Sequence, residues 1–256
     1  MMASKTNNPL GSRGSRGLQE NPNPFKASNW YGFLAEHTFP ASFVKLSPAE
    51  AEALANGKME GDAPKRAMDR LRGPMDSFPG NCFVFVDTAA PTDTERFEGK
   101  RGAVYSPRSA WRYLCESEKV RSAVESGDSD HICVRPFRRM SQPREFRLFI
   151  RDGELLAMSQ YWLVRHFRRL EGRRERYWSM AREFVEGVSW QLPVPTLVMD
   201  IYFTARNEVL IVDLNPWGPP TDPLLIRDWE RDWNASTGIH LIPPPVKIGG
   251  DVNVSF

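Results

Sequence analysis

The sequence lacks most of the features that would assign it to a familiar class at once. It contains only three cysteines, none in a CxxC pair, and its four histidines show no spacing typical of zinc ligands. The cysteines, Cys82, Cys115 and Cys133, stand in apolar or helical surroundings. We therefore expect buried free thiols, and neither a disulfide framework nor a zinc site.

Long apolar runs, internal repeats and a signal peptide are absent as well. No apolar run approaches the length of a membrane span, and the first residues do not follow the basic-then-apolar pattern of a secretory signal. No glycine loop of the P-loop or dinucleotide-binding type is present, nor a serine or cysteine nucleophile motif. We expect a cytoplasmic protein without membrane contact. Its net charge of +2 gives no general argument for nucleic-acid binding.

Several secondary-structure elements are well marked. Ser47-Pro48 with Glu50 forms a capping box for a helix that ends at Asn56-Gly57, and Ser106-Pro107 begins a second helix. Cys82 to Val86 reads as a buried strand, and Ile132 to Phe137 as another. Leu224 to Trp233 is predicted to be helical. By composition, residues 1–28 are predicted to be disordered, and 236–256 form a C-terminal tail.

A predicted β-hairpin near the C-terminus gathers carboxylates. Leu197 to Thr204 and Val209 to Leu214 are rich in strand-forming residues. If the turn centres on Arg206-Asn207, Asp200 lies directly opposite Asp213. On that count the apolar face of the hairpin comprises Met199, Ile201, Phe203, Leu210, Val212 and Leu214, while Tyr202, Thr204, Val209 and Ile211 share the other face with the aspartates.

Two opposed carboxylates need a compensating partner. Opposed Cβ atoms lie roughly 4.5 to 5.5 Å apart, so the two charges repel. Asn215 points to the same side as Asp213, and two carboxylates with an amide carbonyl suit magnesium. A shared proton, an arginine neighbour or a slipped register would also explain the pair. A three-residue loop would place Asp200 opposite Val212 and remove the argument.

A second predicted hairpin, Glu145 to Tyr161, has Asp152-Gly153 as a type I′ turn. Counting from that turn places Glu145 opposite Gln160 and Arg147 opposite Met158, so a carboxylate, a guanidinium and an amide project from one face. They could form a surface ion pair or a ligand-binding group, and the pattern does not choose.

The stretch from Trp162 to Trp190 has apolar residues at near-helical spacing. Its arginines are Arg165, Arg168, Arg169, Arg173, Arg174 and Arg176. We favour a solvated helix face over an anion or RNA contact, and rank RNA binding last among the possible functions.

The run Asp213-Leu214-Asn215-Pro216-Trp217-Gly218, followed by Thr221 to Leu225, resembles the cell-division-cycle protein 123 family. The resemblance extends backward through Asp200, Gln160, Glu145-Phe146-Arg147 and Arg135 in the family's order. It covers roughly residues 30 to 235. The compact chain looks most similar to the family's prokaryotic or viral relatives.

The resemblance implies an α+β, ATP-grasp-like fold, in which two lobes with antiparallel sheets enclose a nucleotide cleft. Residues 29–130 would form the N-terminal part and 131–235 the C-terminal lobe with the metal site. By this resemblance Asp200, Asp213 and Asn215 are ligands of Mg²⁺, and ATP is the cofactor. Arg135 and Arg147 would face its phosphates, since a guanidinium offers paired donors, and Glu145 and Gln160 would line the same cleft.

One position departs from the family pattern. Phe85 stands where the family has a phosphate-binding lysine, and Lys100 or Lys119 would have to replace it. The resemblance leaves two functions open. One is an ATP-dependent carboxylate–amine ligase acting on an unknown substrate. The other is a non-catalytic ATP-dependent assembly chaperone, similar to the eukaryotic members that bind the gamma subunit of translation initiation factor two.

Overall fold

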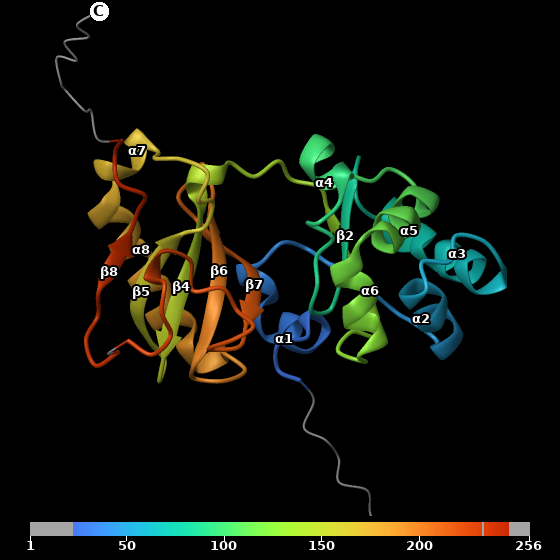
Figure 1. Ribbon diagram of the computed structural model, residues 1–256, viewed down its shortest axis with the longest axis horizontal. Coiled ribbons are helices and arrows are strands. Elements are labelled where there is room, and N and C mark those ends of the chain that lie inside the picture. The colour runs from blue at the N-terminus through green and yellow to red at the C-terminus, as the bar shows by residue number, and fades with distance from the viewer. Residues whose placement is uncertain (1–22, 232, 246–256) are drawn as a thin grey trace, which may run out of the picture.

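The computed structural model describes residues 23–231 and 233–245, and these residues form two sheets that lie side by side (Figure 1). The smaller sheet has three strands in the order β1-β3-β2, and the larger has five in the order β7-β6-β4-β5-β8. All pairings are antiparallel except that of β5 with β8. The predictions for residues 1–22 and 246–256 lie outside the described residues.

The small sheet is covered by helices on one side (Figure 1). Its strands are β1 (Ser42–Lys45), β2 (Cys82–Val86) and β3 (His131–Pro136), and its helices are α2 (Pro48–Ala55), α3 (Asp62–Asp76), α4 (Glu95–Lys100), α5 (Pro107–Glu116) and α6 (Glu118–Glu125). Both predicted helix starts are confirmed, because Ser47 and Ser106 each cap their helix in a capping box. Sequence reasoning missed α3, although Ala67, Leu71 and Met75 give it a buried stripe.

The expected boundary between the two lobes, after residue 130, is misplaced. β3 begins at His131 but is the central strand of the small sheet, paired with both β1 and β2. The chain passes to the large sheet only after Pro136. Conversely, α1 (Ala27–Leu34) and η1 (Ala35–His37) come first in the chain, yet Trp30 and Leu34 pack into the core of the large sheet. That helix also starts inside the segment 1–28 that composition predicts to be disordered.

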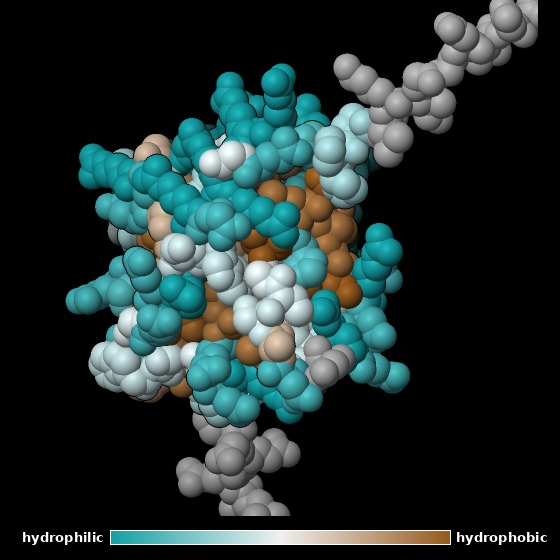
Figure 2. Space-filling view, turned by 90° about the vertical axis from the view of Figure 1, so that its left-hand side faces the viewer, coloured by the Kyte–Doolittle hydropathy of each residue, from teal (hydrophilic) through white to brown (hydrophobic). Residues whose placement is uncertain are grey.

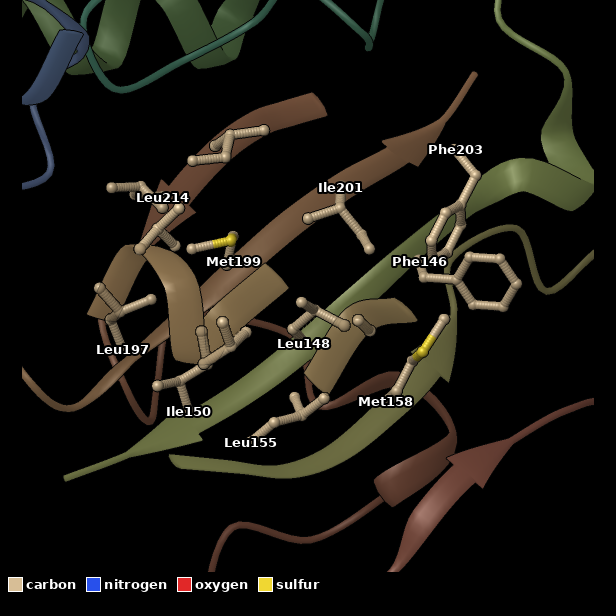
Figure 3. Close-up of a cluster of buried hydrophobic side chains, with 14 of the residues drawn as sticks. Phe146, Leu148, Ile150, Leu155, Met158, Leu197, Met199, Ile201, Phe203 and Leu214 are labelled. Atoms are coloured by element: carbon tan, nitrogen blue, oxygen red, sulfur yellow. The ribbon is translucent and has the colours of Figure 1, made fainter. Parts of the chain in front are cut away.

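The large sheet carries the main hydrophobic core on one face. Its strands are β4 (Glu145–Arg151), β5 (Glu154–Gln160), β6 (Leu197–Phe203), β7 (Val209–Asn215) and β8 (Gly238–His240). Figure 3 shows side chains of β4, β5, β6 and β7 converging on that face, with Phe146, Met158 and Met199 among them. The core also includes Phe85 and Cys133 of the small sheet, so the two sheets share it.

The hairpin of β6 and β7 forms the predicted aspartate pair, but with a different loop and with a bulge that the sequence count did not include. The loop is not the two-residue turn of the sequence count, because Thr204 donates to the carbonyl of Glu208 at 2.9 Å and closes a three-residue loop. A β-bulge then adds one residue, Val212, between the pairs Ile201–Ile211 and Asp200–Asp213. The bulge cancels the shift of the loop, and the aspartates face each other.

The three-residue loop changes the face assignments between itself and the bulge. Ile211 is fully buried in the core and Val209 packs against it, whereas Val212 turns away from the core toward the cleft. The predicted assignment of Val212 and Leu210 to the apolar face is therefore wrong, because each residue between the loop and the bulge is displaced by one position.

A bulge also alters the hairpin of β4 and β5. The Asp152-Gly153 turn forms as predicted, with both residues at positive φ. Leu156 is an extra residue in β5, so Gln160 pairs with Phe146 and Arg147 with Ser159. The predicted pairs of Gln160 with Glu145 and of Met158 with Arg147 are wrong, and Gln160 lies on the opposite face of the sheet from Glu145 and Arg147.

Two helical predictions need correction. The stretch from Trp162 to Trp190 is not one helix, because residues up to Phe167 form a loop before α7 (Arg168–Glu171), α8 (Arg174–Val188) and η3 (Ser189–Gln191). Leu224 to Trp233 is helical only in the short turn η4 (Leu224–Ile226). Trp229 and Trp233 instead pack with Trp217 over Phe149, so aromatic packing determines the path of this segment.

All three cysteines are free and buried, as predicted. Among the described residues, none of the helices combines the length and the apolar character needed to cross a bilayer.

Candidate functional site

A cavity of about 370 Å³ lies between the two sheets. Side chains from both lobes line it, including Phe85 of β2, Arg135 of β3, Glu145 of β4, Asp200 of β6 and Asp213 of β7. Its size falls in the range of small-molecule sites, about 300 to 1,000 Å³. Four of the seven predicted site residues thus meet at one cavity.

Arg135 is a charged group of this cavity whose hydrogen bonding is incomplete. Its side chain is 6% exposed, and its Nη1 donates to the carbonyl of Val212 at 3.0 Å. The guanidinium carbon lies 4.6 Å from the ring centre of Phe85, in cation–π geometry. Its Nε and Nη2 are buried without an acceptor. Burial lowers the pKa of Arg135, but a guanidinium stays charged, so the site is short of an anion.

Arg147 is placed differently, although it shares the predicted role of Arg135. Its Nε and Nη2 donate to the two carboxylate oxygens of Asp200 at 2.7 and 2.8 Å, and its Nη1 donates to the carbonyl of Asp222 at 2.7 Å. Burial acts to lower the pKa of Arg147, but the charge of Asp200 and the hydrogen bonds to it raise it overall. Every nitrogen of Arg147 has an acceptor, so its contacts hold the Asp200 carboxylate in place.

Asp213 has no such partner. Its Oδ1 accepts one hydrogen bond, from the backbone N–H of Leu214 at 3.0 Å. Burial, and then the nearby charge of Asp200, raise the pKa of Asp213 to about 7. Asn215 donates its Nδ2 to Asp200 at 3.3 Å, which leaves its carbonyl oxygen for another partner. The two opposed carboxylates therefore differ. Arg147 neutralises Asp200, whereas the raised pKa of Asp213 brings its carboxylate close to protonation.

Glu145 lies at the junction of this cavity with a smaller one of about 120 Å³. Burial raises the pKa of Glu145 to about 7. The smaller cavity has largely aromatic walls, formed by Phe39, Phe83, Phe97, Phe137 and Trp162, with Arg101 and Arg138 beside them. Phe97 stacks on Trp162 with ring centres 6.4 Å apart. Flat apolar walls next to an acid suit a planar heterocycle that carries hydrogen-bond donors.

Gln160 lies outside both cavities. Its Nε2 donates to the carbonyls of Trp162 and Arg165 at 2.6 and 3.1 Å, and its Oε1 accepts from the N–H of Ile242 at 3.4 Å. Because the bulge in β5 turns it toward the other face of the sheet, its amide binds backbone. Gln160 thus organises the loop after β5, and the structure does not bring it together with the other predicted site residues.

No lysine lines either cavity in the described part of the chain. Phe85, for which the resemblance implies a lysine in the family, forms the surface on which Arg135 stacks. Lys119 reaches only the rim, where its Nζ donates to Thr92 at 3.2 Å, and Lys100 lies exposed on α4. The positive charge at the cavity therefore comes from arginine.

Sequence reasoning missed two aromatic residues that follow β5 directly. Tyr161 lies under Arg147, with the guanidinium carbon 5.3 Å from its ring centre, and Trp162 lines both cavities. The charge of Asp200 is the main cause that raises the pKa of Tyr161, and burial adds to it. Their place next to Gln160 is the one signal in the sequence that could have indicated them.

A separate acidic group beside the cavity has a structural explanation. Asp87, Asp130 and His131 have possible ligand atoms within 4.8 Å of one another. The carboxylate of Asp87, however, accepts backbone N–H groups of Ser28, Asp130 and His131 at 3.0, 3.1 and 2.9 Å. It ties α1 to the end of β2 and the start of β3.

Comparison with known proteins agrees with the predicted relationship. The D123 family model matches residues 111–233, a range that includes all the predicted site residues. A translation initiation factor eIF2 assembly protein of Danio rerio is 32% identical over 89 residues, which is 34% of this chain and 25% of that protein. Cell division cycle protein 123 of Candida glabrata is 34% identical over 101 residues, or 39% and 27% of the two chains.

Over residues 111–233, the chain is similar to the D123 family. The aligned segments span 25% and 27% of the lengths of these D123 relatives. The solved structure of Cdc123 from Schizosaccharomyces pombe matches with a TM-score of 0.73 at 18% identity, over 86% of this chain and 95% of that one. This match confirms the predicted α+β fold with two lobes, which the chain shares with that Cdc123 structure.

Proposed function

We propose that this chain is a D123 family protein that binds a nucleoside triphosphate with magnesium between its two sheets and acts as an assembly factor for a translation initiation factor. The observation that carries the nucleotide part is Arg135, a buried guanidinium with two nitrogens that lack an acceptor in a cavity of suitable size. A buried donor without a partner destabilises a fold by about 1–3 kcal/mol, and more when it is charged. A phosphate oxygen would satisfy both nitrogens.

The donor set also fits a magnesium ion. Asp213 has one hydrogen bond to its carboxylate, and Asn215 has its carbonyl oxygen free of protein donors. Asp200 would share its oxygens between Arg147 and the metal, which a carboxylate with about four lone-pair sites can do. These three residues would hold the ion, and a bound ion would neutralise phosphate charge. Arg147 neutralises Asp200, whereas the Asp213 carboxylate accepts only a backbone hydrogen bond, so a bound cation would also compensate the charge of Asp213.

The assembly role rests on the names of the relatives, eIF2 assembly proteins, and on the composition of the cavity. The resemblance places Phe85 at the position of the family lysine. Among the described residues, no lysine side chain therefore lines the cavity that could move with a phosphoryl group during its transfer. This favours nucleotide binding over turnover. The cytoplasmic location expected from the sequence belongs to this proposal. A carboxylate–amine ligase is the second candidate, favoured by the near-neutral pKa of Glu145, which suits a general base.

Thermal unfolding with and without Mg-ATP tests the nucleotide part. A ligand at about 100 times its Kd stabilises a protein by about 2.7 kcal/mol, so Tm should rise. Arg135→Met should abolish the rise while leaving the apo Tm unchanged or higher, since it removes unpaired buried donors. Arg66→Met, at an exposed arginine of α3, is the matched control and should keep the rise. An undiminished rise in Arg135→Met would place the nucleotide elsewhere.

The metal ligands and the reaction need their own measurements. Asp213→Asn imitates the protonated acid, so it should fold normally and bind ATP equally well with magnesium or with EDTA. A magnesium dependence that survives in Asp213→Asn would remove this residue from the site. ADP formed from ATP in the presence of pooled amino acids and carboxylates would support the ligase. Binding to purified eIF2 subunits that depends on Mg-ATP, without ADP, would support the assembly factor.

A further inference from the structure

The loop after β5 and the start of α8 form a surface of uncompensated positive charge. Residues 163–176 contain six arginines and two glutamates, whereas the whole chain has a net charge of +2. We call seven exposed residues of this segment the arginine surface, namely Leu163, Val164, Arg165, Arg168, Arg169, Arg173 and Arg176; Glu171, Arg174 and Glu175 are exposed among them. None of these arginines makes an ion pair with another described residue. Figure 2 looks onto this end of the molecule, where hydrophilic side chains gather toward the top and the rim around hydrophobic residues at the centre.

The positions of these arginines are unfavourable for the helix that carries them. A helix N-terminus bears partial positive charge and favours acidic residues. Helix α8 begins instead with Arg173 at the N-cap, followed by Arg174 and Arg176. No side chain caps it, and Glu175 is the only acidic residue in its first turn. Helix stability therefore does not explain this clustering, whereas a negatively charged partner would.

Two exposed aliphatic side chains accompany the charge. Leu163 is 43% exposed and Val164 63%, and they are two of the five large hydrophobic residues exposed in the described part of the chain. The loop that presents them is held firmly. Gln160 binds the carbonyls of Trp162 and Arg165, and a nitrogen of the His166 ring lies 2.9 Å from the carbonyl of Ile242. A partner would meet a preformed backbone and lose little conformational entropy in binding it.

The exposed aliphatic residues, together with the packing of the aromatic ones, indicate a protein partner. Proteins that bind single-stranded RNA stack bases on exposed aromatic rings. Here Trp162 packs on Phe97, and Phe167 is 9% exposed beneath Arg165. No ring of this loop is left for a base, while Leu163 and Val164 offer the contact that aliphatic side chains of a peptide would make. Arginine forks match carboxylates in a bidentate geometry.

We infer that the arginine surface docks an acidic segment of a partner protein, one that carries aliphatic side chains among its carboxylates. The surface begins next to Trp162, which lines both cavities, so a docked segment would lie beside the opening of the cleft. The inference stands on charge and exposure outside the cavity and does not require nucleotide binding. It gives the proposed assembly factor a surface for its partner.

Fluorescence anisotropy without nucleotide tests this inference. The probes are a labelled peptide of alternating acidic and leucine residues, the same peptide with serine for leucine, and oligouridine. The leucine peptide should bind the full chain more tightly than the serine peptide. The variant Arg169→Glu/Arg173→Glu/Arg176→Glu should bind it about tenfold more weakly or worse, since three charge-assisted contacts are lost. Leu163→Ser/Val164→Ser should remove the preference for leucine.

The matched control reverses the same number of exposed arginines that make no ion pair, on α3 and α5: Arg66→Glu/Arg108→Glu/Arg112→Glu. It should bind like the unaltered chain. The arginine-surface variant should also melt no lower than the unaltered chain, because acids at the start of α8 suit the helix dipole. Failure of the leucine peptide to bind, or equal binding by both triple variants, would overturn the inference. Oligouridine binding that only the arginine-surface variant loses would identify a nucleic-acid site instead.

Discussion

The two sheets beside the cavity carry one buried arginine each, and the two differ in hydrogen bonding: Arg135 lines the cavity, whereas Arg147 binds Asp200 of its wall. Arg147, on the large sheet, has acceptors for all three of its nitrogens, whereas Arg135, on the small sheet, has one acceptor and two nitrogens without any. Both are nearly inaccessible to solvent, and from the sequence both were expected to face phosphates. Arg147 therefore contributes to the stability of the fold, whereas the unpaired nitrogens of Arg135 are available to a ligand.

The largest loss of stability should come from removing the carboxylate that binds Arg147. Asp200→Ala leaves Arg147 buried without its carboxylate, and loss of one partner of a buried pair lowers the free energy of unfolding by about 3–5 kcal/mol. Urea unfolding would measure this loss. The double variant Arg147→Met/Asp200→Leu removes both charges and should recover most of it. A single variant as stable as the unaltered chain would show that the pair contributes little.

An intermediate effect should come from the acid that neither arginine neutralises. No ion pair joins Glu145 to either arginine, and burial raises its pKa from 4.5 to about 7. Because the folded state holds the proton more tightly, the contribution of Glu145 to stability is present below pH 4.5 and is lost as the pH rises to about 7. The loss is about 3 kcal/mol.

Unfolding of Glu145→Gln across this pH range would test the assignment. The variant should lack this part of the pH dependence and should become more stable than the unaltered chain toward pH 8. Glu154→Gln, at an exposed residue of β5, is the control and should keep the full dependence. An unchanged profile in Glu145→Gln would assign the titration to another group.

The smallest effect concerns the single acceptor of Arg135. The bulge at Val212 frees the carbonyl to which Arg135 donates. Deletion of Val212 would keep Asp200 opposite Asp213 but remove that carbonyl, so Mg-ATP should bind about tenfold more weakly, a difference of about 1.4 kcal/mol. Deletion of Leu156, the bulge residue of β5, is the counterpart and should leave binding unchanged. Isothermal titration calorimetry would compare the two, and equal losses would mean that strand shortening alone is responsible.

The two bulges also limit how much of the strand pairing could be predicted from the sequence. The hairpin at Asp152-Gly153 and the capped helices α2 and α5 were predictable because a few local residues determine them. The pairing of Gln160 was not, because one extra residue in β5 reverses the face of everything beyond it, and no local signal marks Leu156 as extra. The aspartate pair was predicted with the wrong loop, since a bulge at Val212 cancelled the error.

By itself, the sequence indicated the family resemblance, the class of fold and the acidic and basic residues that meet at the cavity, because those depend on local pattern and on residue identity. Only the tertiary structure decided which arginine is satisfied. That depends on where the carbonyls of Asp222 and Val212 come to lie, and both reach the arginines through segments distant in the sequence. Burial then determines the outcome, because a charge that water cannot reach must find its partners in the fold or in a ligand.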